Sequence, residues 1–293
     1  MIISYKKFVI LERLGISQDV EVLSNYLKSK ITDKSLTIDN IPLKLSKPIN
    51  KIFIDINRNR NSNTEAHFDI GRSSLTNKGY DLYLVFSPNP TLEFISHEVS
   101  HAFQFIMKGR EQSLHDIDRL KSAKLAKGLL PFGAKNSKLN EVVDLIYYLS
   151  DSEIDSYVVE LYSHITQLSK KYKIDKVTFQ LLVKGFESYE VCKFVDSIEL
   201  SEYLKDIPIE DKIKFFSILK EEEFRLKNIN IKNNLFRKIS NFYHFFKMVI
   251  KSEPVKKIEV DELHLVIDKW NKYFKIKSSK LKMKLFRLYD LFL

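Results

Sequence analysis

The chain has 293 residues, 44% of them apolar and 12% aromatic, which is enough to bury a sizeable core as one large or two modest domains. Its single cysteine, Cys192, excludes an internal disulfide framework and a thiolate zinc site, and leaves imidazole and carboxylate as the available metal ligands. The 48 Lys and Arg against 38 Asp and Glu give a net charge of +10, which would suit an acidic protein, a nucleic-acid backbone or an anionic membrane surface.

The N-terminal sequence has no long apolar core followed by a small-residue cleavage site, and no run approaches the roughly 18 apolar residues that span a bilayer. We therefore expect a chain that is not exported by the general route. The expected location is the cytoplasm, or the virion if the chain is encoded by a phage. Heavy use of lysine, isoleucine and asparagine fits an AT-rich genome.

The first third of the chain predicts one helix and a small sheet. Apolar residues at near-helical spacing indicate a helix within residues 1–30. Short runs of alternating apolar and polar residues, rich in β-branched side chains, then predict strands at 35–38, 51–56, 66–70 and 81–86. Gly71 and Gly79 are expected in the connection between the last two strands.

A helix is predicted after this sheet, because Asn89 can cap it, Pro90 suits its first position and Gly109 ends its periodic pattern. Its apolar stripe would bury it in a core and consists of Leu92, Ile95, Val99, Ala102, Phe103 and Ile106.

This helix carries the sequence His97-Glu98-Val99-Ser100-His101. Residues four apart project from one helix face, so the imidazoles of His97 and His101 can share one tetrahedral Zn²⁺ at about 2.0–2.1 Å. Glu98 follows the first ligand directly and can act as the general base that takes the proton from a zinc-bound water. The alternative is a pair of helix histidines that make ordinary hydrogen bonds.

With this H-E-x-x-H motif, the chain resembles the zincin metallopeptidases over the helix, the strand before it and a later helix. Gln104 and Met107 stand where a metzincin has glycine and histidine, which disfavours that branch. The resemblance then implies a gluzincin-like site, in which a glutamate of a later helix is the third zinc ligand.

A later helix over residues 150–164 offers that glutamate. Its Glu153, Tyr157, Glu160 and His164 recur at helical spacing, as the wall of a site requires. We predict Glu153 as the third ligand, with Glu160 and Asp155 as alternatives.

Two sequence features bear on the choice of Glu153. Ser150-x-x-Glu153 is also a capping box, in which the glutamate would reach back to the backbone amide of the cap and bind no metal. Glu153-Ile154-Asp155-Ser156, however, resembles the E-x-x-[AS] helix of phage-associated and ImmA-type zinc peptidases, where the glutamate binds zinc. Tyr157 departs from the E-x-x-x-D form of thermolysin-like enzymes.

That departure leaves open which carboxylate orients a ligand histidine, and Asp151 or Asp155 could supply it. Tyr157 or His164 could donate a hydrogen bond to the oxyanion of the tetrahedral intermediate. The resemblance also implies that a peptide pairs with an edge strand above the metal, here 66–70 or 81–86, although such an edge can equally be covered and bind nothing.

Two further histidines are weaker candidates. His67 lies on a predicted strand, where a lone histidine is more often structural. His115 lies in the basic, glycine-containing stretch 108–140, which could form a lid over a cleft, and we expect it to be exposed to solvent.

From residue 171 no catalytic motif is recognisable. Helical apolar spacing predicts helices at 174–186, 209–224, 231–251, 260–273 and 280–293. Aromatic and basic residues interleave within 236–251 and lysines crowd 265–293, a mixture found in nucleic-acid binders but equally in a buried core with a solvated rim.

The sequence therefore predicts an α+β fold, with a small mixed sheet packed on the H-E-x-x-H helix and a mainly helical C-terminal half. We expect a zincin-like metallopeptidase domain over 1–170 and a basic helical region over 171–293. The predicted function is hydrolysis of peptide bonds in a peptide or protein substrate. The alternatives are a catalytically inactive zincin-fold structural or interaction protein, such as a virion component, and a basic nucleic-acid-binding protein.

Overall fold

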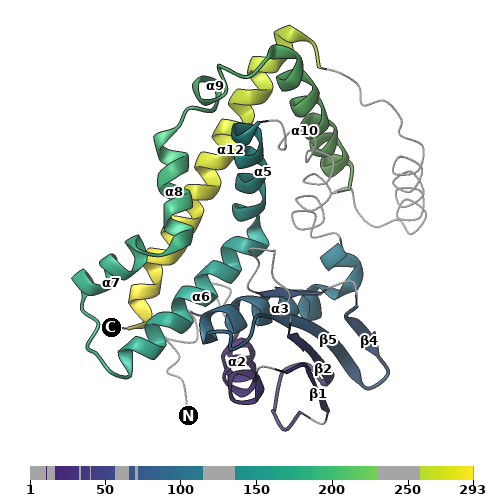
Figure 1. The fold of residues 1–293 in the computed structure, drawn as a ribbon, viewed down its shortest axis with the longest axis vertical. Coiled ribbons are helices and arrows are strands. Elements are labelled where there is room, and N and C mark those ends of the chain that lie inside the picture. The colour runs from purple at the N-terminus through teal and green to yellow at the C-terminus, as the bar shows by residue number, and fades with distance from the viewer. Residues whose placement is uncertain are drawn as a thin grey trace. The chain divides into compact units, whose positions relative to one another are not determined.

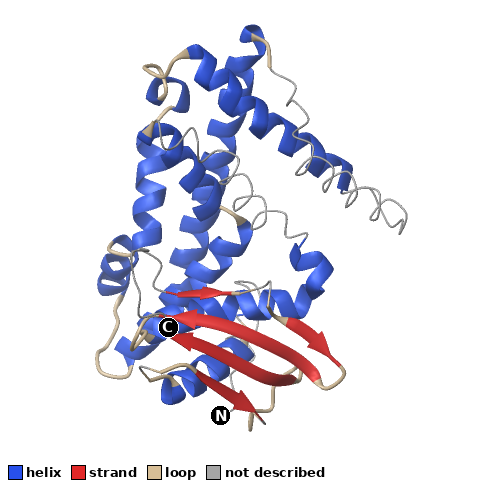
Figure 2. Ribbon diagram, turned by 45° about the vertical axis from the view of Figure 1, so that its right-hand side comes forward, coloured by secondary structure: helices blue, strands red, loops and turns tan. Residues whose placement is uncertain are grey.

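The computed structural model describes residue 11 and residues 17–32, 34–39, 41–56, 66–69, 72–114, 136–229 and 258–292, with only the backbone given for 108–114 and 220–229. Its elements confirm the predicted α+β class, because a five-stranded mixed sheet precedes a mainly helical second half (Figures 1 and 2). None of the described helices combines the length and apolar character needed to cross a bilayer.

The sheet is built around a parallel pair of long strands. β2 (Ile49–Ile56) and β5 (Gly79–Phe86) run parallel, and the shorter strands are antiparallel to them in the order β1-β2-β5-β3, with β4 also paired to β5. The three short strands are β1 (Leu36–Asp39), β3 (Ala66–Phe68) and β4 (Ser74–Thr76). The sequence missed β4, since three residues are too few to show a period of two.

Strand β5 lies inside the sheet, so the prediction that 81–86 could be an edge strand is wrong. Its alternating apolar residues fit an interior position as well as an edge, and pairing on both sides is a tertiary property. The other candidate, β3, ends the strand order, and its exposed side chain is His67.

One face of the sheet packs against α3 (Leu92–Leu114). Along β2 and β5 the buried side chains are Ile52, Ile54, Ile56, Leu82, Leu84 and Phe86. Phe105 of α3 contacts the sheet through Phe68, with ring centroids 5.7 Å apart, and the Tyr80 hydroxyl donates to the carbonyl of Ile106 at 3.2 Å. The sheet therefore supports the helix that carries both motif histidines.

Both predicted ends of the H-E-x-x-H helix are wrong by a few residues. The helix begins at Leu92, and the Thr91 side chain accepts a bond from the Phe94 amide, whereas Asn89 has a positive φ of 55° and Pro90 precedes the helix. The helix also continues through Gly109 to Leu114, because an interior glycine costs only about 1 kcal/mol and does not by itself end a helix.

The chain folds as two compact units. Unit 1 takes its residues from 1–119, 148–196 and 276–293, and unit 2 from 120–147 and 197–275. This division differs from the boundary predicted after residue 170, because unit 1 includes helices on both sides of that residue and the last part of the chain.

Unit 1 contains the sheet, α3 and several helices that precede or follow them in the chain. These are α2 (Gln18–Lys30), α6 (Asp151–Ser169), α7 (Lys176–Lys184), α8 (Glu187–Ser197), the second half of α12 (Val260–Arg287) and the 3-10 helix η1 (Leu288–Leu291). The end of the chain packs on α6 and α7 through aromatic rings, Tyr162 with Phe292 at 6.0 Å and Phe179 with Tyr289 at 5.1 Å.

Unit 2 is helical in its described residues and contains most of α5 (Ser137–Tyr148), α9 (Leu200–Tyr203), α10 (Ile209–Ile229) and the first half of α12. Lys138 pairs with Asp206 at 3.1 Å, and Asn271 accepts a bond from the Leu200 amide at 3.2 Å. The helices predicted at 260–273 and 280–293 form one continuous helix, since Phe274 and Ser278 between them are buried. The helix predicted at 231–251 lies outside the described residues.

Gly79 is expected to be the glycine on which the sheet depends most. Its φ is +133°, and a Cβ built there would lie 2.5 Å from the carbonyl oxygen of Pro48, which accepts a bond from the Tyr80 amide. Gly79→Ala should therefore lower the free energy of unfolding by about 1–3 kcal/mol, measured by denaturant unfolding.

The matched control is Gly185→Ala at the C-cap of α7. The φ of Gly185 is −86°, and a Cβ there would make its nearest contact at 3.4 Å, which is ordinary packing. Its unfolding free energy should change by less than about 1 kcal/mol. Equal losses in the two variants would contradict the role given to Gly79.

Candidate metal centre

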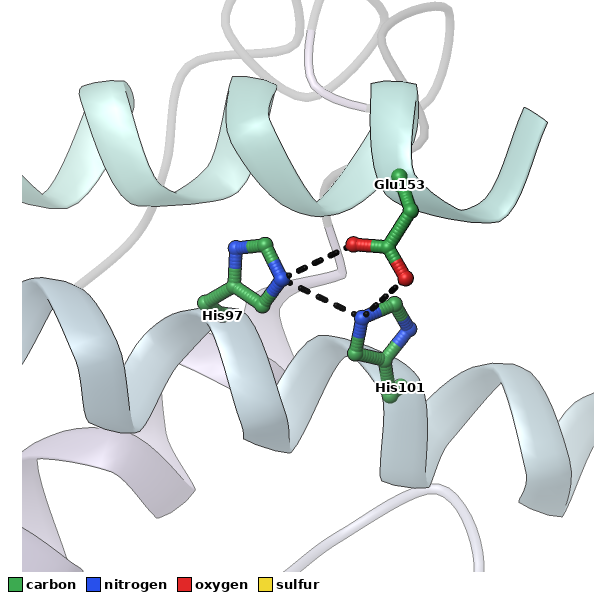
Figure 3. A group of neighbouring side chains, drawn as sticks. All are labelled: His97, His101 and Glu153. Atoms are coloured by element: carbon green, nitrogen blue, oxygen red, sulfur yellow. Dashed lines mark hydrogen bonds and ion pairs between the residues drawn. The ribbon is translucent and has the colours of Figure 1, made fainter. Parts of the chain in front are cut away.

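Helix α3 presents His97 and His101 on the face that meets α6 (Figure 3). Their spacing of four residues places the rings one above the other, with centroids 4.9 Å apart. The two Nε2 atoms approach to 3.2 Å, so both rings aim the same nitrogen at one point. His101 is almost fully buried and His97 is 13% exposed, which leaves that point open on the His97 side.

Helix α6 supplies a carboxylate to the same point. Glu153 lies in the first turn of α6, is buried, and places Oε2 3.2 Å from Nε2 of His97 and Oε1 3.3 Å from Nε2 of His101 (Figure 3). Ligands about 2.05 Å from a tetrahedral ion lie about 3.3 Å from one another. His97, His101 and Glu153 thus form a group able to bind a metal ion, with ligand atoms within 4.8 Å of one another.

The Glu153 side chain does not form the capping box. Ser150 caps α6 by accepting a bond from the Glu153 amide at a long 3.4 Å. The carboxylate turns to the histidines instead of back to the cap, and half of the predicted capping box is therefore absent among the described contacts.

Gln104 determines which nitrogen of His101 carries a proton. The backbone carbonyl of Ser152 can only accept a hydrogen bond, so the group 3.1 Å from it must be the donor Nε2 of the Gln104 amide. The amide oxygen of Gln104 then faces Nδ1 of His101 at 3.1 Å and must accept its proton. In the neutral ring Nε2 of His101 therefore carries the lone pair and directs it at the shared point, as metal binding requires.

Glu160 has the corresponding role for His97. Its Oε2 lies 2.9 Å from Nδ1 of His97, one turn further along α6 than Tyr157. By sequence, Glu160 was only an alternative third ligand, and Asp151 or Asp155 was the expected orienting carboxylate. Both aspartates instead pair with lysines of α12, because they lie on the opposite side of α6.

The site strongly favours a positive charge. Burial alone would lower the pKa of His97, but Glu153, Glu160 and the nearby Glu98 outweigh it and raise that pKa to about 10. Burial would likewise raise the pKa of Glu153, and His101 and His97 more than offset it and hold that pKa well below its usual range. The same negative carboxylates would stabilise a cation between these groups, whether it is a proton or a metal ion.

Two buried carboxylate oxygens lack a hydrogen bond. Among the described residues, Oε2 of Glu98 has no hydrogen-bond partner, and Oε1 of Glu153 has only its 3.3 Å ion-pair contact with Nε2 of His101. Leaving a buried charged oxygen without a partner is costly, so a ligand or a water molecule at these atoms would stabilise the protein. The donor set therefore fits a bound metal ion beside Glu98.

Comparisons of the chain with protein-family models, with curated proteins and with solved structures give no match. The site is thus described by its own chemistry, two imidazole nitrogens and one carboxylate on facing helices.

The remaining histidines and Tyr157 take different positions. Tyr157 lies against His97 with ring centroids 5.3 Å apart and is half-buried. Nδ1 of His164 pairs at 2.9 Å with Glu93, which lies four residues before His97 on α3. His67 is exposed on β3, and His115 lies outside the described residues. None of these histidines joins the metal group found among the described residues.

Replacement of Gln104 tests its link to His101. Gln104→Met keeps the length of the side chain but removes both bonds, so the apparent metal affinity should fall about 10- to 100-fold, as for other partners of metal-binding histidines. Gln167→Met is the control, because Gln167 donates to Glu93 and touches no residue of the metal group. Titration calorimetry with Zn²⁺ would compare them, and equal affinities would remove Gln104 from the site.

The pair of Glu93 and His164 predicts a pH dependence of stability. The bond from His164 lowers the pKa of Glu93 from 4.5 to about 2, a contribution present above pH 4.5 and lost as pH falls towards 2. The bond from Glu93 raises the pKa of His164 above 6.5, a contribution present below pH 6.5 and lost as pH rises through the raised value.

The parent and Glu93→Gln should therefore differ most in unfolding free energy between about pH 4.5 and 6.5, and less on either side. Denaturant unfolding in steps of one pH unit measures this difference. A difference that does not change from pH 5 to pH 9 would show that the two residues do not form an ion pair in solution.

Proposed function

We propose that this chain is a zinc-dependent metallopeptidase whose metal is held by His97, His101 and Glu153. The observation that carries the proposal is the convergence of the Nε2 atoms of His97 and His101, whose Nδ1 atoms each contact another side chain, with a buried carboxylate 3.2–3.3 Å away. Imidazole with carboxylate suits Zn²⁺, and a site with three protein ligands is typical of catalytic rather than structural zinc.

A Zn²⁺ ion bound there would act as a Lewis acid that polarises a carbonyl and makes water more acidic. Glu98 is the proposed general base. It follows His97 on α3, is 6% exposed, and has one carboxylate oxygen without a partner among the described residues. That oxygen can accept a proton from the attacking water and return it to the leaving amine of the cleaved peptide bond.

Tyr157 is the proposed donor to the oxyanion of the tetrahedral intermediate. It contacts His97 on the partly exposed side of the site, where a substrate carbonyl would have to enter. His164 was the other candidate, and its bond to Glu93 favours Tyr157 over it.

The nucleic-acid alternative has less support. It depends on the lysine-rich segment 265–293, and within that segment at least five of the eight basic side chains pair with carboxylates of the chain itself, among them Lys275, Lys277, Lys280, Lys282 and Lys284. The other basic stretch, 236–251, lies outside the described residues.

Metal content and turnover of four proteins test the proposal. The parent should hold about one zinc per chain after dialysis, and His97→Ala and Glu153→Ala should lose it, because each removes one of three ligands. Glu98→Gln should keep the zinc, since it loses only the general base. It should cleave an unfolded protein labelled with a self-quenching fluorophore about 10²- to 10⁴-fold more slowly than the parent.

The outcomes separate the hypotheses for the site. If the parent protein retains zinc but cleaves no substrate, the result would support the alternative of an inactive zincin-fold protein. An unchanged cleavage rate in Glu98→Gln would show that the mechanism is wrong, and no zinc in the parent after its addition would remove the metal site.

A further inference from the structure

The first turn of α6 directs carboxylates to two sides. Glu153 faces the histidines of α3, whereas Asp151 and Asp155, two residues before and after it, contact α12 on the opposite side. Residues four apart share one helix face, and residues two apart do not. Any shift of this turn would therefore move Glu153 relative to both histidines.

Three lysines of α12 hold the aspartates. Lys277 and Lys280 both bind Asp151, at 2.7 and 2.6 Å, and Lys284 binds Asp155 at 2.5 Å. Lys277 and Lys284 are only 15% exposed, whereas Asp151 and Asp155 are 47% and 33% exposed, so these pairs are partly shielded from water and salt. We call Lys277, Lys280 and Lys284 the lysine clamp.

On the α3 side, the amide of Gln104 binds the carbonyl of Ser152 in the first turn of α6, whereas the helix's own cap fixes it only weakly. The capping hydrogen bond from the Glu153 amide to the Ser150 hydroxyl is long, at 3.4 Å. The Glu153 carboxylate contacts the histidines and not the backbone amide of the cap. Three carboxylates within five residues also repel one another, although the helix dipole favours them at this end. Pairing Asp151 and Asp155 with lysines neutralises two of the three and leaves Glu153 as the charge presented to α3.

The clamp itself is anchored in unit 1. On the same half of α12, Leu281 and Leu285 are fully buried, and the carbonyl of Ser278 accepts a bond from the Cys192 thiol of α8. Lys282 pairs with Asp196 of α8 at 2.6 Å. This part of α12 can therefore act as a fixed support for the first turn of α6.

We propose that the lysine clamp is a set of positioning residues for the metal centre, which hold Glu153 at the distance from His97 and His101 that metal binding needs. The inference rests on the metal site of the proposed function but not on its catalytic step. It assigns to α12, which is far from the motif in sequence, a part in metal affinity that acts through Glu153.

A positioning role and a purely electrostatic role predict opposite signs. Removing a lysine near a bound Zn²⁺ removes a like charge and leaves an aspartate unpaired, so electrostatics alone would strengthen metal binding. Loss of positioning would weaken it, because Glu153 would no longer be held near the histidines.

The experiment compares variants of the full chain that keep the lysine stems. In the triple variant Lys277→Met, Lys280→Met, Lys284→Met the affinity for Zn²⁺ should fall about tenfold, by analogy with other outer partners of metal ligands. The triple arginine variant at the same positions should bind as the parent does. Lys282→Met, which breaks an ion pair of similar length between α12 and α8, is the matched control and should also bind as the parent does.

Binding of Co²⁺ supplies a second readout, since its visible absorption depends on which ligands surround it. The spectrum of the triple methionine variant should differ from that of the parent, and that of Lys282→Met should not. Unchanged or tighter Zn²⁺ binding in the triple methionine variant would overturn the inference and leave the metal site intact. A parent that binds neither ion would overturn the proposed function together with this inference.

Discussion

The structure around α3 and α6 depends on one unfavourable arrangement. Two imidazole nitrogens and a buried carboxylate are brought together away from water, where each would be costly to bury alone. This cost is offset when a positive charge lies between them. The pKa of His97 is raised for the same reason, because the carboxylates stabilise its positive charge. A metal ion between the three groups would supply the same positive charge, and the partners on Nδ1 of both rings orient Nε2 towards that position.

The surrounding elements can be understood as supports for that arrangement. The sheet covers one face of α3, so the face with His97 and His101 points away from the sheet. Gln104 bridges the two helices directly, with one end of its amide on His101 and the other on the backbone of α6. On the far side of α6, α12 binds the two aspartates that flank Glu153.

This arrangement also explains why the helix α6 is so polar at its start. Its first turn faces the histidines of α3 on one side and the lysines of α12 on the other, so carboxylates at alternate positions all have partners. The high lysine content of the last helix, which by sequence could signal an acidic partner or nucleic acid, is in large part matched by carboxylates of this same chain.

The sequence by itself determined the α+β class, four of the five strands and the helix that carries the motif, because these depend on short-range period and propensity. It also singled out His97 and His101, since a spacing of four residues has a local geometric meaning. The choice of Glu153 needed a resemblance as well, because a capping box has the same spacing.

Only the tertiary structure decided which side of α6 meets α3, and therefore that Glu160 and not Asp151 or Asp155 contacts His97. It likewise decided that β5 is an interior strand and that the end of the chain belongs to the same compact unit as the motif. These are contacts between residues far apart in the chain, and local periodicity does not record which neighbour a helix face will meet.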